Sequence, residues 1–367
     1  MFLDYFQGRR VLVTGHTGFK GSWLSLWLDK LGAKVTGLSI DVPTVPALFD
    51  LADVESLVAH RVGDIRDSQA VDAALEASDA EIVFHLAAQP LVRLSYEEPV
   101  DTLSVNVIGT AQVLEAVRRR GKPCSVIVIT SDKCYANNGQ IWGYREIDPM
   151  GGHDPYSMSK GAAELVVDSW RNSYFAASDS PIRLASVRAG NVIGGGDWAK
   201  DRLITDCIAA LTRQAPIEIR NPLATRPWQH VLEPLSGYLW LAARLATSED
   251  PQAYAQGWNF GPYIDGVRPV RDLVDFALKC WGGGSWQMTK DADQPHEAFA
   301  LALNCDKAHQ HLKWRPAWDF EASVGETIAW YRQWADGADD IRALTLGQIA
   351  AYESAARQAA IAWALPG

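Results

Sequence analysis

A glycine-rich turn near the start of the chain constrains the fold more than any other segment. Gly15, Gly18 and Gly21 recur at every third position, directly after the apolar run 11–13 and directly before the apolar stretch 23–28. Glycine is needed where a side chain would obstruct a phosphate or force the backbone into a disallowed conformation. A helix N-terminus also offers bare N–H groups to an anion. The pattern therefore predicts a strand–turn–helix unit that binds the pyrophosphate of a dinucleotide.

The first half of the chain alternates β-type and helical segments. Strands are predicted over residues 10–14, 34–39, 81–86, 125–130 and 182–188, the last after a long helix that begins near Pro155. Residues 35–38 and 82–86 are nearly continuous apolar runs, which are typical of strands buried on both faces. The alternation predicts an α/β fold with a Rossmann-type, doubly wound parallel sheet.

After Asn191 this alternation weakens. Glycine clusters, a proline-rich turn at 221–227 and helices predicted over 231–245 and 270–281 indicate a smaller, mixed α/β C-terminal lobe for the substrate. We expect a dinucleotide-binding domain over residues 1–190 and a substrate lobe mainly over 191–345 that interleaves with it. A C-terminal helix is expected over 346–367.

Composition excludes several classes of protein. The formal net charge of −10 argues against a nucleic-acid partner. No apolar stretch reaches the roughly 18 residues of a membrane span, and the acidic N-terminal segment does not resemble a secretory signal. The five cysteines are scattered and form no C-x-x-C pair, so neither a metal site nor a disulfide framework is expected. A cytoplasmic location fits this cysteine usage.

A tyrosine–lysine pair supplies the second predicted site. Pro155 is suited to the first turn of a helix, so Tyr156 and Lys160 are expected to lie on one helix face, four residues apart. The lysine ammonium is expected to favour the tyrosinate and lower the phenol pKa. The phenol then takes a proton from an alcohol as hydride leaves the same carbon.

Together, the glycine turn and this pair resemble the extended short-chain dehydrogenase/reductase family, which includes the NAD-dependent epimerases and dehydratases. The likeness covers nearly the whole chain and implies NAD as cofactor. In one departure, the second strand ends at Ser39, where the family usually has an acidic residue for the adenosine ribose, and Asp41 lies two residues beyond as a substitute. The cofactor contacts that the resemblance implies are Gly15, Thr17, Gly18, Phe19, Lys20, Gly21, Asp64, Ile65, Leu86, Ala87, Ala88, Tyr156 and Lys160.

The segment Ser131-Asp132-Lys133, at the end of the strand predicted over 125–130, narrows the choice of reaction. The family places there a hydroxyl that assists the tyrosine, and its nucleotide-sugar 4,6-dehydratases add two ionisable residues, typically Asp-Glu. Lysine in the second position resembles the dehydratases that act on CDP-glucose. The resemblance therefore implies conversion of CDP-glucose to CDP-4-keto-6-deoxyglucose, with Asp132 protonating the departing C6 hydroxyl. Lys133 either takes the C5 proton as a neutral amine or stays charged and stabilises the enolate.

Further contacts and properties rest on the same resemblance. It implies substrate binding by Asn106, Asn191, Arg188, Arg202, Arg226 and Asn259. It also implies a homodimer, formed by the helix after Tyr96 and the helix that carries Tyr156, or a homotetramer. A place in bacterial deoxysugar biosynthesis, such as that of O-antigen, follows from it as well.

The sequence is also compatible with two other kinds of function. Another nucleotide-sugar dehydratase or a 4-epimerase would share the tyrosine–lysine pair. A catalytically silent NAD-binding sensor would bind the cofactor without consuming a sugar nucleotide.

Overall fold

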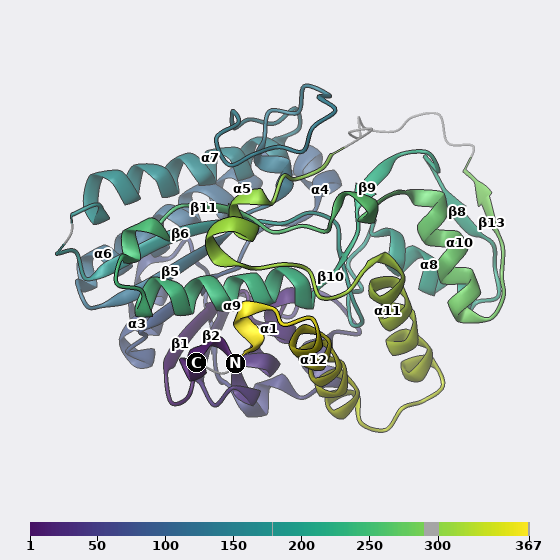
Figure 1. Cartoon of the computed structure of the whole chain (residues 1–367), viewed down its shortest axis with the longest axis horizontal. Helices are drawn as coiled ribbons and strands as arrows, with labels where there is room; N and C mark the ends of the chain where they lie inside the picture. Colours follow the sequence, from purple (N-terminus) through teal and green to yellow (C-terminus); the bar gives the residue numbers. More distant parts are fainter. Residues whose placement is uncertain (178, 290–300, 366–367) are drawn as a thin grey trace.

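A seven-stranded parallel sheet forms the centre of the molecule (Figure 1). The computed structural model describes residues 1–177, 179–289 and 301–365. Its strands in spatial order are β11 (Gly257–Asn259), β6 (Ile182–Arg188), β5 (Cys124–Ile129), β4 (Ile82–His85), β1 (Arg10–Thr14), β2 (Lys34–Ser39) and β3 (Ala59–Val62). The predicted doubly wound parallel sheet is confirmed, and the strand order reverses between β1 and β4.

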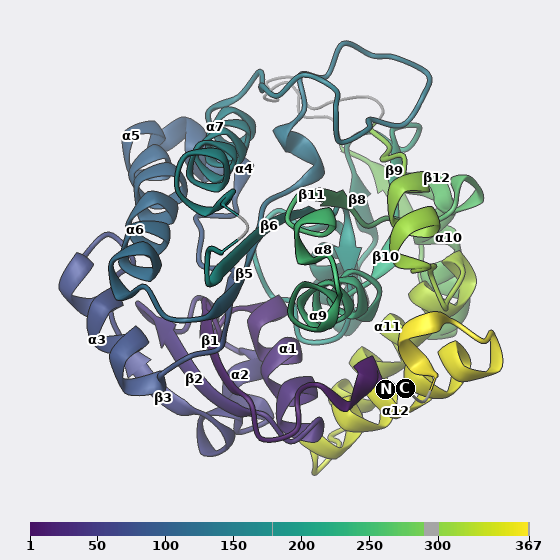
Figure 2. The same cartoon turned by 60° about the vertical axis from the view of Figure 1, so that its left-hand side comes forward.

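Helices cover both faces of the sheet (Figure 2). Side chains alternate along each strand, so Val11 and Val13 of β1 join one hydrophobic cluster and Leu12 joins the other. The first cluster includes α1 (Phe19–Lys30) and α9 (Leu232–Thr247), and the second includes α3 (Ser68–Ser78), α6 (Thr110–Arg120) and α7 (Pro155–Trp170). Because α9 and β11 come from beyond residue 190, the second half of the chain helps to build this layered core.

Local sequence explains where α7 begins. The Asp154 carboxylate accepts a hydrogen bond from the backbone N–H of Ser157 at 2.9 Å, and Pro155 occupies the first helical position. This start sets Tyr156 and Lys160 in the first turns of a helix that packs along the sheet. The cap therefore fixes the register of the tyrosine–lysine pair.

The second lobe combines three small sheets with several helices, to the right in Figure 1. Its strands pair as β7 (Val192–Ile193) with β10 (Gln229–His230), β9 (Thr225–Pro227) with β12 (Val267–Pro269), and β8 (Ile217–Ile219) with β13 (Trp286–Met288). Its helices are α8 (Leu203–Thr212), α10 (Val270–Trp281), α11 (Phe320–Ala335) and α12 (Ile341–Gln358). The short helices α2 (Leu48–Leu51), α4 (Val92–Glu97) and α5 (Pro99–Leu103) belong to the first half of the chain.

The C-terminal helix differs from its predicted range. It begins at Ile341, where Asp340 caps it by accepting from the backbone N–H of Ala343 at 2.8 Å, and it ends at Gln358. Ala360 then adopts a left-handed φ of 51°, which is incompatible with a continuing right-handed helix. Residues 366 and 367 of the predicted range lie outside the described residues. None of the described helices is long and apolar enough to cross a membrane.

Candidate active site

A cavity of about 1230 Å³ lies at the carboxyl ends of the sheet strands, between the sheet and the second lobe. The segments that follow β1, β2, β4, β5 and β6 all contribute to its wall, as the rule for open α/β sheets requires. Its volume exceeds the usual upper range of about 1,000 Å³ for a pocket that holds one ligand. The cavity therefore has room for a dinucleotide and a second molecule together.

The glycine turn supplies one wall. Gly15 has a φ of +77°, and a Cβ there would lie 2.7 Å from the backbone nitrogen of Ala87. A Cβ on Gly21 would lie 2.1 Å from the carbonyl oxygen of Gly15, so both positions require glycine. At Gly18 a Cβ would meet only that carbonyl, at 3.5 Å, and α1 begins at the next residue. Bare backbone at a helix N-terminus thus faces the cavity, which fits a dinucleotide pyrophosphate.

The end of β2 carries a hydrogen-bonded network in place of a carboxylate. The Ser39 hydroxyl lies 2.9 Å from Nδ1 of His16, and Nε2 of His16 lies 2.7 Å from Nδ1 of His60. Burial lowers the pKa of His16 to about 4, so the ring is neutral at pH 7. Asp41 also lines the cavity, and its carbonyl accepts a hydrogen bond from Thr17.

Asp64 and Ile65 lie in the wall nearby. The Asp64 carboxylate pairs with the Arg66 guanidinium at 2.6 Å, and this hydrogen bonding lowers the pKa of Asp64. Leu86, Ala87 and Ala88 follow β4 and line the cavity next to the glycine turn. All of the predicted cofactor contacts from Gly15 to Ala88 therefore line the cavity.

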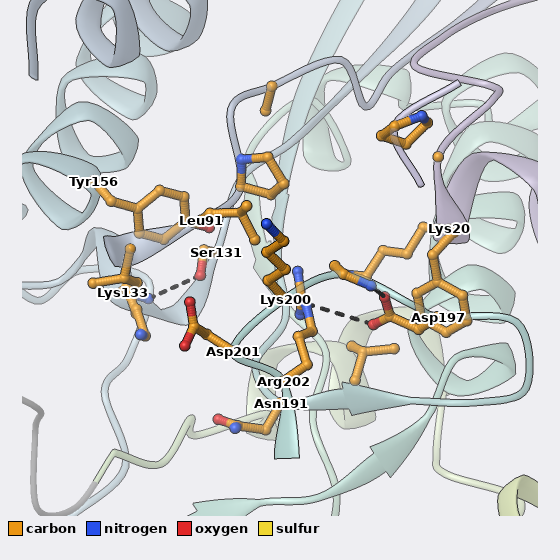
Figure 3. A pocket seen from close by; sticks show the side chains of 18 of the residues that line it. Lys20, Leu91, Ser131, Lys133, Tyr156, Asn191, Asp197, Lys200, Asp201 and Arg202 are labelled. Atoms are coloured by element: carbon orange, nitrogen blue, oxygen red, sulfur yellow. Dashed lines mark hydrogen bonds and ion pairs between the residues drawn. The ribbon is translucent and has the colours of Figure 1, made fainter. Parts of the chain in front are cut away.

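Tyr156, Ser131, Asp132, Lys133 and Lys160 all line the centre of the cavity, several of them shown in Figure 3. The ring centroid of Tyr156 lies 6.0 Å from Nζ of Lys133 and 6.0 Å from Nζ of Lys160. The Ser131 hydroxyl donates to Oδ1 of Asp132 at 2.9 Å and accepts from the backbone N–H of Lys133 at 3.2 Å. Helix α7 thus presents the phenol to a hydroxyl, a carboxyl and two amines.

The phenol pKa departs from its predicted direction. Burial raises the pKa of Tyr156 to about 12, against the lowering effects of a hydrogen bond with Ser131 and the charge of Arg202. Burial also lowers the pKa of Lys160 to about 8, so the amine remains mostly protonated at pH 7. The predicted lowering of the Tyr156 pKa by Lys160 is wrong for this structure, because desolvation is the largest effect on the phenol and the groups that oppose it are Ser131 and Arg202.

Asp132 is buried, and its Oδ2 has no hydrogen-bond partner within the described part of the chain. Desolvation raises the pKa of this carboxyl, although the charges of Lys133, Arg226 and Lys20 oppose the rise. A Cβ on Gly190 would lie 1.9 Å from Oδ2, so glycine is required behind the carboxyl. Burial thus shifts the Asp132 carboxyl toward the protonated form relative to a carboxyl in water, and the protonated form is the one that donates a proton.

The side chain of Lys20 extends from the glycine turn into the cavity (Figure 3). Burial lowers its pKa to about 8, and the charges of Arg202, Asp132 and Lys160 act on it. The sequence predicted Lys20 as a cofactor contact, and the direction of its side chain is a finding of the structure.

The segment 197–202 forms the opposite wall. Arg202 pairs with Asp197 at 3.5 Å (Figure 3). Asp201 lies 3.3 Å from both Arg93 and Arg220. Neither Arg93 nor Asp197 was assigned a role from the sequence. No local sequence pattern predicts an ion pair between residues that lie more than a hundred positions apart. Two predicted substrate contacts, Asn191 and Arg226, line the cavity beside this segment.

Three predicted substrate contacts, Arg188, Asn259 and Asn106, do not line the cavity. The Arg188 guanidinium is buried against the Glu164 carboxylate, with an ion pair of 2.8 Å. Asn259 donates to the carbonyl of Tyr144 at 2.8 Å and accepts from the Tyr135 hydroxyl, also at 2.8 Å. Both side chains are buried beside the sheet, where their polar groups already form hydrogen bonds or ion pairs with other residues of the protein.

Asn106 is buried next to the cavity wall. It accepts from the backbone N–H of Gln89 at 2.8 Å and donates to the Ser159 hydroxyl at 2.9 Å. It therefore joins the turn after β4 to helix α7, and its contact with the site passes through these neighbours.

A doubly wound sheet, a glycine turn at a helix N-terminus and a tyrosine–lysine pair on one helix are together the features of the short-chain dehydrogenase/reductase class. The model of the NAD dependent epimerase/dehydratase family matches residues 11–257. This chain belongs to that family.

Individual relatives agree with the family match. A CDP-glucose 4,6-dehydratase of Salmonella typhimurium (strain LT2) is 50% identical over 339 residues, which are 92% of this chain and 94% of that protein. A probable dTDP-glucose 4,6-dehydratase of Sinorhizobium fredii is 27% identical and covers 88% of this chain and 92% of its own length. The crystal structure of a Bacillus anthracis dTDP-glucose 4,6-dehydratase in complex with NAD is similar in fold. Its TM-score is 0.75 at 19% identity, with coverage of 91% of this chain and 100% of that one.

Proposed function

We propose that this chain is an NAD-dependent CDP-glucose 4,6-dehydratase, a lyase that forms CDP-4-keto-6-deoxyglucose and water. The observation that carries the proposal is the meeting of Ser131, Asp132 and Lys133 with Tyr156 and Lys160 in one cavity. The 50% identity to a CDP-glucose 4,6-dehydratase over 92% of the chain supports the substrate.

The glycine turn fits the cofactor, because its exposed backbone at Gly18 leaves space for a pyrophosphate. NAD, when bound, supplies a hydride acceptor for C4 of the glucose and a hydride donor for C6. The proposed contacts run along the cavity wall from Gly15–Gly21 through Asp64, Ile65 and Leu86–Ala88 to Tyr156 and Lys160.

Tyr156 and Ser131 are proposed to remove the proton of the C4 hydroxyl as the C4–H bond breaks. A phenol of raised pKa is a weak acid, so its anion is a strong base once formed. Lys160, on the same helix face, is proposed to orient the nicotinamide ribose and to stabilise the phenolate by its remaining charge.

Elimination of water needs an acid at C6 and a base at C5. Asp132 is proposed as the acid, because burial keeps its carboxyl protonated to a higher pH than usual. Lys133, whose Nζ lies 6.0 Å from the ring centroid of Tyr156, is proposed to take the C5 proton and to return it when hydride adds to C6. The hydride and the C5 proton are thereby restored. Tyr156 then holds the proton taken from the C4 hydroxyl and Asp132 lacks the proton that left with water, so one proton passes from the phenol to the Asp132 carboxylate, through solvent, to complete the cycle.

Arg202 and Arg226 are proposed to bind the diphosphate, and Asn191 to orient the sugar. All three line the cavity on the side of the second lobe. Guanidinium groups match paired phosphate oxygens in geometry and charge.

We also propose a homodimer through α5, α6 and α7, in the cytoplasm, within deoxysugar biosynthesis. Exposed apolar side chains support the interface, among them Val100 on α5, Ile108 in the helical segment between α5 and α6, and Leu165 on α7. Five free cysteines fit a reducing compartment.

The test is mass spectrometry of CDP-glucose after incubation with the purified protein and catalytic NAD⁺, beside dTDP-, GDP- and UDP-glucose. The proposal predicts loss of one water from the CDP-sugar alone, with no accumulation of NADH. If none of the four sugars loses water, the dehydratase assignment is wrong. If another sugar nucleotide reacts in preference, the nucleotide assignment is wrong.

A further inference from the structure

The segment that carries the proposed acid and base leaves the sheet directly after β5. The backbone N–H of Thr130 still pairs with the carbonyl of Val187 on β6 at 2.9 Å, and the chain then forms the short 3₁₀ turn Asp132–Cys134. A turn of three residues with 3₁₀ hydrogen bonds is weakly constrained on its own. The position of Asp132 and Lys133 therefore depends on what holds the chain on either side of the turn.

On one side, Thr130 is tied to helix α7. Its hydroxyl donates to Oε1 of Glu164, and the Val187 carbonyl, at 3.2 Å, is the more distant of its two acceptors. Glu164 lies one helical turn after Lys160 on the same face of α7, and the side chains of Thr130 and Glu164 are both buried. The residue before Ser131 is therefore joined directly to the helix face that carries the tyrosine–lysine pair.

On the other side, Tyr135 is tied to the ion-pair partner of Glu164. The Arg188 guanidinium donates to the Tyr135 hydroxyl at 2.6 Å, and this hydroxyl donates in turn to Oδ1 of Asn259 on β11. The same guanidinium donates to the two oxygens of the Glu164 carboxylate, at 2.9 and 2.8 Å. Thr130 and Tyr135 are thus anchored to the two halves of one buried ion pair.

A buried ion pair is weak evidence for stability, because desolvation of the two charges offsets their attraction. Two parallel hydrogen bonds between a guanidinium and a carboxylate do fix the geometry of the groups that they join. We propose that the Glu164–Arg188 pair positions the segment 131–133 against the tyrosine–lysine pair through the two anchoring hydroxyls. This inference rests on the proposed function, in which both sets of residues act on one sugar.

Thr130→Val tests one anchor, since valine keeps the shape of threonine without the hydroxyl, and Thr130→Ser is the conservative variant that retains it. Ser186→Ala is the matched control. The Ser186 hydroxyl donates to Oε2 of the same Glu164 carboxylate at 2.7 Å, but Ser186 lies within β6, and Arg188 continues to hold that oxygen. The experiment measures kcat and KM for dehydration of CDP-glucose by each NAD-loaded protein, and the free energy of unfolding by urea denaturation.

Thr130→Val is expected to lower kcat by about 10- to 100-fold, because a misplacement of about 1 Å can cost about 100-fold. KM is expected to stay close to the wild-type value, because the proposed diphosphate contacts Arg202 and Arg226 lie outside this network. Ser186→Ala and Thr130→Ser are expected to keep the wild-type kcat, even where Ser186→Ala lowers stability as much as Thr130→Val does. Tyr135→Phe removes the other anchor and should lower kcat in the same way, so it decides the question if Thr130→Val does not fold.

A wild-type kcat in folded Thr130→Val, or an equal fall in Ser186→Ala or Thr130→Ser, overturns this proposal and leaves the dehydratase function standing. The ion pair would then contribute to the fold alone. A wild type that removes water from none of the four sugar nucleotides overturns the proposed function, and this inference with it.

Discussion

At the scale of single residues, the surroundings of Asp132 distinguish it from the other carboxylates of the cavity. Only Oδ1 has a partner, the Ser131 hydroxyl at 2.9 Å, while Oδ2 is buried with no hydrogen bond to the described residues. An unpaired carboxylate oxygen that is shielded from water is costly, and protonation removes much of that cost. Burial thereby raises the pKa of the Asp132 carboxyl, which is the direction that its proposed role as proton donor requires.

Asp132→Asn is expected to separate the two halves of the reaction. The amide keeps the size and the hydrogen bond to Ser131 but gives no acidic proton, so water loss should slow by about 10²- to 10⁴-fold. Oxidation at C4 does not need this proton. Reduced cofactor should therefore accumulate after mixing with CDP-glucose, as measured by nicotinamide absorbance alongside mass spectrometry of the sugar.

Tyr156→Phe is the control for this experiment, because it removes the group proposed for the first step. It should show neither reduced cofactor nor loss of water. If Asp132→Asn also forms no reduced cofactor while remaining folded and able to bind NAD, Asp132 acts before the elimination, and its assignment as the acid at C6 is wrong.

At the scale of elements, Glu233 joins three parts of the second half of the chain. Its carboxylate on α9 accepts from the backbone N–H groups of Ala317 and Trp318, at 3.0 and 2.7 Å, and from the Tyr352 hydroxyl of α12 at 2.7 Å. Burial nevertheless raises the pKa of Glu233 from its ordinary 4.5 to about 7. The folded protein therefore binds a proton here more tightly than the unfolded chain does.

This difference predicts a pH dependence of stability. Because the pKa is raised in the folded state, the contribution of Glu233 is complete below pH 4.5 and is lost as pH rises through 7, a change on the order of 3 kcal/mol. Glu233→Gln should flatten this part of the curve of unfolding free energy against pH, measured by urea denaturation. Tyr352→Phe, which removes a hydrogen bond that lowers the Glu233 pKa, should extend the fall in stability to higher pH. A wild-type slope in Glu233→Gln would show that Glu233 does not titrate in this range.

Elements with strong local signals were predictable to the residue. β1, β2 and β6 have the predicted bounds, because apolar or β-branched runs end at turn residues, and α7 begins where an Asp-Pro pair caps it. β11 was not predicted, since its three residues gain their strand conformation only from pairing with β6. The C-terminal helix begins before its predicted range, because its cap, Asp340, precedes the alanine-rich stretch on which the prediction was based.

At the scale of the whole molecule, the sequence indicated the cavity residues that stand in contiguous motifs, such as 15–21, 131–133 and 156–160. Of the three arginines predicted as substrate contacts, Arg202 and Arg226 line the cavity and Arg188 does not. Arg188 is paired with Glu164 on α7, and Arg93 meets Asp201, only because the fold brings these distant segments together. Charge alone does not distinguish a buried ion pair from a substrate contact, so three-dimensional placement was needed.

The proposed subunit interface is also a property of the whole molecule. Leu165 on α7 is 62% exposed, and Val100 and Ile108 lie exposed on the segment packed beside it. Burying such side chains against a second copy contributes about 25 cal/mol for each Å² removed from water. A charge in the centre of that contact would have to be desolvated without a partner. Leu165→Glu is therefore expected to convert the dimer to a monomer, as measured by sedimentation equilibrium.

Leu223 gives the matched control for this change. It is also an exposed leucine, at 54%, but it lies in the turn before β9, far in the chain from α5, α6 and α7. Leu223→Glu should keep the wild-type mass, since it introduces the same charge outside the proposed interface. Wild-type mass in Leu165→Glu, or dissociation caused by Leu223→Glu, would place the interface elsewhere. A monomeric wild type would remove the basis for any interface, and the exposed apolar side chains of α7 would then need a different explanation.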